Sequence, residues 1–116
     1  NDKPNGLKIK YDAQGNVKTK EPKVDGETHG ASESFDKLGA LAKSCEYVKG
    51  IKHGFQKGFY PDGTLKKIEE FRGGLREGVE RSFYPDGPVK SETEYKEGKI
   101  VRVKVDYTPD GKIIEK

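Results

Sequence analysis

The stretch GFYPDGTLKKIEEFRGGLREGVERSFYPDG, residues 58–87, contains the segment FYPDG twice, 24 residues apart. In the second copy, Pro85 presets the φ of the second turn position, Asp86 suits the third, and Gly87 can take the left-handed conformation that closes the loop. Each copy therefore predicts a type I turn followed by a glycine bulge, which is a common β-hairpin loop.

The same spacing governs the glycines of the whole chain, because thirteen of the fifteen fall into three columns with a period of 24 residues. The columns are Gly15, Gly39, Gly63, Gly87 and Gly111; then Gly26, Gly50, Gly74 and Gly98; then Gly6, Gly30, Gly54 and Gly78. The first two columns mark predicted turns. Tandem repeats of fixed length are typical of stacked units that bury their apolar sides against neighbours.

The repeat predicts a single domain over residues 1–116. Its units are 6–29, 30–53, 54–77, 78–101 and 102–116. Between the turns lie segments with the length and the period-two alternation of β-strands. We therefore predict an all-β fold, an elongated antiparallel β-meander sheet of about ten strands built from tandem β-hairpin repeats.

Alternation in the fourth unit predicts that the sheet has one apolar face. The apolar residues are all odd-numbered: Leu75, Val79, Phe83, Val89 and Tyr95. If Phe83 opposes Val89 across the turn, odd residues lie opposite odd residues and the apolar stripe stays on one side.

The third glycine column falls inside predicted strands, where glycine costs roughly 0.5 to 1 kcal/mol relative to alanine. Gly30, Gly54 and Gly78 either form bulges that bend the sheet or leave room for a neighbouring aromatic ring. We favour bending. Arg102 replaces this glycine in the last unit, so we expect the curvature to change near the C-terminal edge.

The segments EYVKGIKHGFQKGFYPDG, EFRGGLREGVERSFYPDG and EYKEGKIVRVKVDYTPDG resemble the MORN repeat, in particular its bacterial variant. The likeness covers residues 6–116 and is strongest over 45–111. The first two units depart from it, with YDAQG and FDKLG in place of YPDG. The resemblance implies a long antiparallel sheet of consecutive hairpins and no enzyme activity.

Composition argues against several classes of function. Basic residues number 23 and acidic residues 20, interleaved along the chain, so no basic cluster exists for nucleic acid. No apolar run approaches the roughly 18 residues that span a bilayer, and we expect a soluble protein. The compartment stays unknown; a signal segment removed before Asn1 would make the protein periplasmic or secreted, and the resemblance implies a bacterial source.

No candidate for catalysis, metal or cofactor binding emerges. His29 and His53 lie one repeat apart, hence roughly 9.6 Å at about 4.8 Å per strand, too far to share a zinc ion. Glu46, Glu70 and Glu94 repeat on an open face and are predicted to form cross-strand ion pairs. Cys45 is expected to be a buried small hydrophobe rather than a nucleophile.

Tyr60 and Tyr84 are candidate contacts for a partner, since exposed tyrosines in register combine apolar area with a hydroxyl. The alternative is that they pack over Pro61 and Pro85.

We predict a non-enzymatic protein-binding or scaffold module, of an antitoxin-like or immunity-like kind by resemblance, whose partner is unidentified. The alternative is a module without kinase activity that associates with a membrane surface or phosphoinositide. Exposed outer strands would also permit edge-strand self-association.

Overall fold

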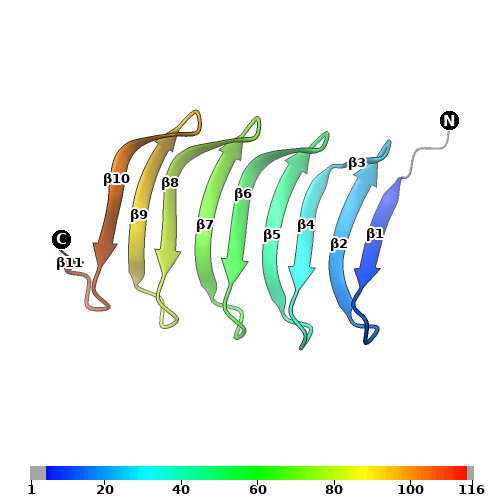
Figure 1. Ribbon diagram of the computed structural model, residues 1–116, viewed down its shortest axis with the longest axis horizontal. Helices are drawn as coiled ribbons and strands as arrows, with labels where there is room; N and C mark the ends of the chain where they lie inside the picture. Colours follow the sequence, from blue (N-terminus) through cyan, green and yellow to red (C-terminus); the bar gives the residue numbers. More distant parts are fainter. Residues whose placement is uncertain (1–4, 115–116) are drawn as a thin grey trace.

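The computed structural model describes residues 5–114, which form one antiparallel sheet with no helix in that range (Figure 1). The strands are β1 (Gly6–Tyr11), β2 (Val17–Val24), β3 (Glu27–Thr28), β4 (Gly30–Phe35), β5 (Leu41–Val48), β6 (Ile51–Phe59), β7 (Leu65–Arg72), β8 (Leu75–Phe83), β9 (Val89–Lys96), β10 (Lys99–Tyr107) and β11 (Ile113–Ile114). Apart from β3, which pairs only with β2, each strand pairs with the next along the chain. The predicted fold class is confirmed.

The sheet is a single layer with extents of 56 × 34 × 17 Å. Figure 1 shows the strands side by side from β1 to β10, with the ends of the chain on opposite sides. No helix among residues 5–114 has the length and apolar character required to cross a membrane.

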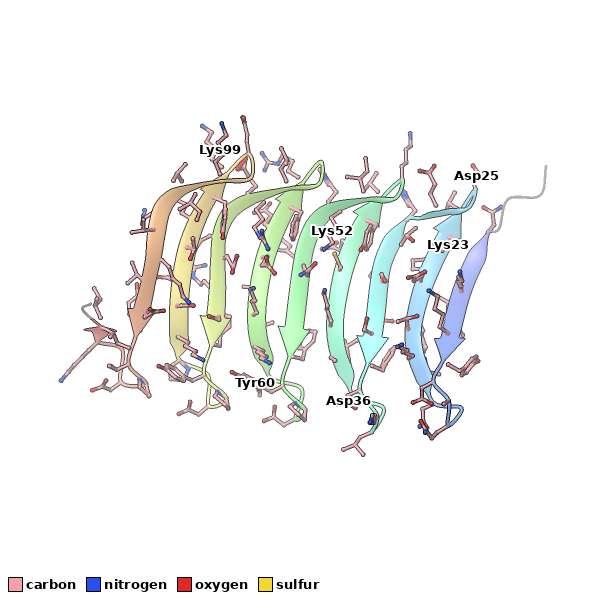
Figure 2. All side chains as sticks on the ribbon, viewed as in Figure 1. Lys23, Asp25, Asp36, Lys52, Tyr60 and Lys99 are labelled. Atoms are coloured by element: carbon pink, nitrogen blue, oxygen red, sulfur yellow. The ribbon has the colours of Figure 1, made fainter. Side chains whose placement is uncertain are left out.

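The five-residue loops lie at one end of the strands, where Figure 2 labels Asp36 and Tyr60. The amide of Gly87 donates to the carbonyl of Tyr84, and the amide of Tyr84 donates to the carbonyl of Pro88, at 2.9 and 2.8 Å. The same pair of bonds recurs in all five loops. The closing glycine of each loop has a positive φ, from 86° to 112°. This geometry is the type I turn with a glycine bulge that the FYPDG segments predict.

The prediction of one apolar face is wrong, because a second irregularity follows each of the first four of these loops. Phe83 does oppose Val89, as expected, but Ser82 then opposes Ser91, which leaves Lys90 as an extra residue on β9. A one-residue slip moves every later side chain to the other face. Tyr95 therefore lies on the face opposite to Val79, since Val79 pairs with Glu94.

Two-residue turns join the strands at the other end, where Figure 2 labels Asp25 and Lys99. Both residues of each turn have positive φ, 50° and 81° at Lys49 and Gly50, which defines a type I′ hairpin. The glycine amides of the last three turns donate to the preceding hairpin: Gly50 to the carbonyl of Thr28 at 2.8 Å, Gly74 to that of Lys52 and Gly98 to that of Arg76, both at 2.9 Å. A Cβ on Gly98 would lie 3.3 Å from Cδ2 of Leu75, so the turns pack tightly on one another.

The third glycine column lies at bends of the sheet, as predicted. Gly54 and Gly78 have φ of 110° and 81°. Between the pairs Ile68–Arg81 and Glu70–Glu77, two steps along β7 match four along β8, so β8 gains two residues and bends. The space over these glycines is filled by Glu46 and Glu70, not by an aromatic ring.

The expected change of curvature at Arg102 does not occur, because β10 keeps the bend seen in β8 (Figure 1). The two-residue slip persists there as two separate irregularities, between Ile100 and Arg102 and between Arg102 and Val105. The guanidinium of Arg102 lies 3.0 Å from the carboxylate of Glu94, where the earlier units place glycine under glutamate. The ion pair between Arg102 and Glu94 thus replaces the close contact of glycine with glutamate that the earlier units have.

Candidate functional site

One face of the sheet carries a connected set of charged side chains over two aromatic rings. We call it the network face and define it by Lys52, Gln56, Lys67, Glu69, Phe71, Arg76, Glu80 and Tyr95. The strand pairs Gln56–Glu69, Phe71–Arg76 and Lys67–Ser82 place these residues on the same side. Among the described residues, the buried hydrophobic side chains are Cys45 and Phe71, and the buried polar ones are Glu69 and Thr93.

Glu69 is the centre of this network, with only 3% of its surface exposed. Its Oε1 accepts from Nε2 of Gln56 at 3.1 Å and its Oε2 accepts from Nε of Arg76 at 2.9 Å. Gln56 in turn accepts from Nζ of Lys52 at 2.8 Å. Nζ of Lys67 lies 3.7 Å from Glu69 and 3.2 Å from Glu80. A buried carboxylate is tolerated because both of its oxygens have charged or amide donors.

The two aromatic rings support the cations of the network. Nζ of Lys52 lies 5.0 Å from the centre of the Phe71 ring, and the guanidinium of Arg76 lies 5.8 Å from Phe71 and 5.5 Å from Tyr95. The hydrogen bond to Glu69 raises the pKa of Arg76 above its usual value. On this face, the aromatic rings are therefore covered by the long side chains of cations and not by a second layer of secondary structure.

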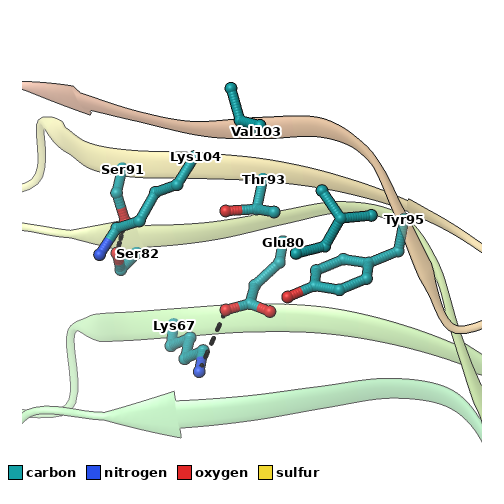
Figure 3. A pocket seen from close by; sticks show the side chains of 9 residues that line it. Lys67, Glu80, Ser82, Ser91, Thr93, Tyr95, Val103 and Lys104 are labelled. Atoms are coloured by element: carbon teal, nitrogen blue, oxygen red, sulfur yellow. Dashed lines mark hydrogen bonds and ion pairs between the residues drawn. The ribbon is translucent and has the colours of Figure 1, made fainter.

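A hollow of about 420 Å³ opens on this face between β7 and β10 (Figure 3). Lys67 and Glu80 form its floor at one side, Ser91, Thr93 and Tyr95 come from β9, and Lys104 reaches over from β10. Ser82 and Ser91 share a hydrogen bond across the strands. Within the lining, Lys67 pairs with Glu80 at 3.2 Å.

The two histidines accept hydrogen bonds from turn amides. Nδ1 of His29 accepts from the amide of Lys49, and Nδ1 of His53 from that of Gly73, both at 3.2 Å. Two further residues of the same column do likewise: the side chains of Asn5 and Glu77 accept from the amides of Asp25 and Glu97, at 3.1 and 3.2 Å. Residues 5–114 contain no group of three His, Cys, Asp or Glu that could hold a metal ion.

We expect His53→Ala to lower the free energy of unfolding by about 0.5 to 1 kcal/mol, because the turn amide of Gly73 loses its acceptor. His53→Asn should recover most of this loss, since an asparagine oxygen makes the same bond at Asn5 in the first unit. Urea denaturation of the three proteins measures both effects. Equal losses in the two variants would show that the imidazole acts through something other than its acceptor nitrogen.

The glutamate column forms a predicted cross-strand ion pair at Glu94 and a different contact at Glu46. Oε2 of Glu46 accepts from the amide of Phe55 at 2.9 Å, which satisfies a backbone donor freed by the bulge. Glu94 pairs with Arg102 at 3.0 Å. Cys45 is buried, as predicted, and burial raises the pKa of its thiol, which disfavours the nucleophilic thiolate.

Tyr60 and Tyr84, the predicted partner contacts, are half-buried and bond to the following repeat. The hydroxyl of Tyr60 donates to the carbonyl of Phe83 at 2.5 Å, and that of Tyr84 donates to the carbonyl of Tyr107 at 2.7 Å. Nζ of Lys66 lies 5.6 Å above the Tyr60 ring. The structure thus gives both tyrosines a role between repeats, and contact with a partner stays a prediction.

A second hydrogen-bonded cluster, centred on the carboxylate of Glu92, lies near the C-terminal edge on the face opposite to the network face. The carboxylate of Glu92 accepts from the hydroxyl of Tyr107 and from Nε of Arg81, both at 2.6 Å. These bonds, that of Tyr107 first, hold the pKa of Glu92 below its ordinary value of 4.5. The same bond raises the pKa of Tyr107.

This shift predicts a pH dependence of stability. Because the pKa of Glu92 is lower in the folded than in the unfolded protein, its contribution is complete above pH 4.5 and is lost as the pH falls through the folded value. Glu92→Gln should therefore flatten the fall of unfolding free energy in this acidic range. Urea titrations between neutral and acidic pH test this, with Glu97→Gln as an exposed control. Parallel curves for Glu92→Gln and the unmutated protein would contradict it.

Sequence reasoning missed Glu69, Arg76, Thr93 and the Glu92–Tyr107 pair. One signal could have found two of them. Glu69 and Thr93 follow Cys45 at the repeat spacing, and Cys45 was predicted to be buried. Applying the period to burial, and not only to glycine, would have indicated both positions.

These features define an open, single-layer repeat sheet whose network face is held together by hydrogen bonds and ion pairs. Residues 52–72 and 76–97 match the family model described as MORN repeat variant, at two adjacent repeats. The first match covers most of β6 and β7 and the second most of β8 and β9. The family is consistent with a repeat module that binds proteins or membranes. No curated protein matches the chain.

Proposed function

We propose that this protein is a non-enzymatic binding or scaffold module whose partner is another protein. The observation that carries the proposal is the single layer: large apolar side chains at both edges have nothing packed over them. Leu7 on β1 is 56% exposed and Val103 on β10 is 75% exposed. Exposed apolar groups on a regular sheet are typical of surfaces that contact other proteins.

Rigidity supports the same proposal. Backbone bonds tie successive repeats at the turns of Gly50, Gly74 and Gly98, and the hydroxyls of Tyr60 and Tyr84 add bonds at two of the wider loops. A surface that is ordered before binding loses less conformational entropy when a partner arrives. The sheet is therefore suited to holding a partner.

A narrower version of the proposal is an antitoxin-like or immunity-like role, in which the sheet neutralises a toxin by covering it. The support is the resemblance to bacterial repeat proteins, which is an analogy between families. Co-expression with the product of a neighbouring toxin gene tests this version. Rescue of growth by the unmutated protein is expected, and undiminished toxicity would count against it.

The general proposal is tested by capture of a partner with the tagged protein, followed by reconstitution from purified components. A stoichiometric complex that persists in gel filtration is the expected result. Sedimentation with anionic vesicles, reversed by salt, addresses the alternative of membrane-surface or phosphoinositide association. Vesicle binding without any reconstituted protein complex would overturn the proposal in favour of that alternative.

A further inference from the structure

The outer edge of β10 is open over most of its length. Of its nine residues, only Asp106 and Tyr107 pair with β11, and no other described strand lies against this edge. The backbone from Lys99 to Val105 thus offers hydrogen-bonding groups to an added strand, as unpaired edges do.

Aliphatic side chains stand exposed on both sides of this edge. Ile100 and Val101 are exposed by more than half, and Val103 is 75% exposed. The side chains of an added strand would cover such residues. Apolar contact and backbone pairing would then act together, as they do when an extended peptide extends a sheet.

Charge indicates the nature of the added strand. Lys99, Arg102 and Lys104 give the edge three cations, and on its inner side β10 already lies against the acidic residues Glu92 and Glu94 of β9. The outer strand at the other end of the sheet is also basic, with Lys8 and Lys10 on β1. Pairing β10 with either edge of a second copy would set like charges side by side, which is unfavourable.

We propose that the edge of β10 between Lys99 and Val105 is a docking site for an extended acidic segment of a partner protein, which adds an antiparallel strand to the sheet. Its glutamates or aspartates would face the cations, and its aliphatic side chains would cover Val101 together with Ile100 and Val103, which both line the hollow of the network face. This inference rests on the protein-binding function proposed above and names its site.

The probe is a capped synthetic peptide of about nine residues, a typical strand length, that alternates glutamate with valine or threonine. Fluorescence anisotropy should show saturable binding that weakens as salt is raised. The double variant Lys99→Glu, Lys104→Glu should weaken it about tenfold. A peptide methylated on alternate backbone nitrogens should not bind, because it cannot pair with the edge.

The matched control is Lys37→Glu, Lys49→Glu, which makes the same change of net charge at two exposed turn lysines. It should bind as the unmutated protein does. Thermal unfolding checks that both double variants fold, and hydrogen exchange on the unmutated protein should slow at residues 99–105 when the peptide is added. Equal weakening in both double variants, no saturable binding, or self-association through β10 that excludes the peptide would each overturn the site.

The binding function and this site can fail separately. If a reconstituted partner complex survives Lys99→Glu, Lys104→Glu and leaves exchange at residues 99–105 unchanged, the site is wrong while the binding function stands. If no partner complex can be reconstituted at all, the binding function itself fails.

Discussion

Glu69→Ala should lower the free energy of unfolding by about 2 to 4 kcal/mol, the largest loss expected for a single side chain of this protein. The carboxylate is nearly inaccessible to water and receives donors from Gln56 and Arg76. Its removal leaves a cavity beside Phe71 and unpaired donors around it. Urea denaturation at neutral pH measures the loss.

A second variant separates burial from charge. Glu69→Thr places at this position the residue that the next repeat carries at Thr93, which is also buried. We expect an intermediate loss, because a hydroxyl can accept from one of the donors and cannot balance the charge of Arg76. Glu97→Ala, in an exposed turn, is the control. A loss below about 0.5 kcal/mol for Glu69→Ala would show that the network contributes little.

Gly54→Ala should cost about 2 to 3 kcal/mol, through backbone strain and a steric clash together. Gly54 has a φ of 110°, and a Cβ there would lie 2.9 Å from Oε2 and 3.2 Å from Cβ of Glu46. The clash would also displace the carboxylate that accepts from the amide of Phe55. Thermal and urea unfolding measure the effect.

Alanine substitutions at two other glycines give smaller expected losses for comparison. Gly63→Ala adds strain alone, because its φ is 91° and no atom lies within 4 Å of the added Cβ, so about 1 kcal/mol is expected. Gly58→Ala should be nearly neutral, since Gly58 lacks a positive φ and the nearest atom is 4.0 Å away. A ranking in which Gly54→Ala costs no more than Gly58→Ala would contradict the proposed bend.

The architecture could be predicted from the sequence because it depends on local turn chemistry. FYPDG sets a loop with five residues wherever it occurs, and the 24-residue columns repeat the hairpin along the chain. The two-residue turns were predicted only as turns, from the column of Gly26, Gly50, Gly74 and Gly98, with no turn type assigned. Their positive φ at both central residues defines them as type I′.

The faces of the sheet could not be predicted from alternation alone. The extra residue at Lys90 depends on how β9 pairs with β8, and a single shift of register exchanges the two faces. The role of the histidines was hidden for a similar reason, because the amide that His53 accepts from lies 20 residues further along the chain. Such bonds become visible only when the hairpins are placed side by side.

The functional surface depends on the sheet remaining one layer, and small-angle scattering of the monomer tests that most directly. The open sheet has a radius of gyration of 16.6 Å, and its scattering should give a value near this with an elongated distance distribution. A compact globule of the same length would have about 13 Å. The larger value is the expected result. A value near that of the globule, for a protein that sedimentation shows to be monomeric, would contradict the open sheet and the binding edges derived from it.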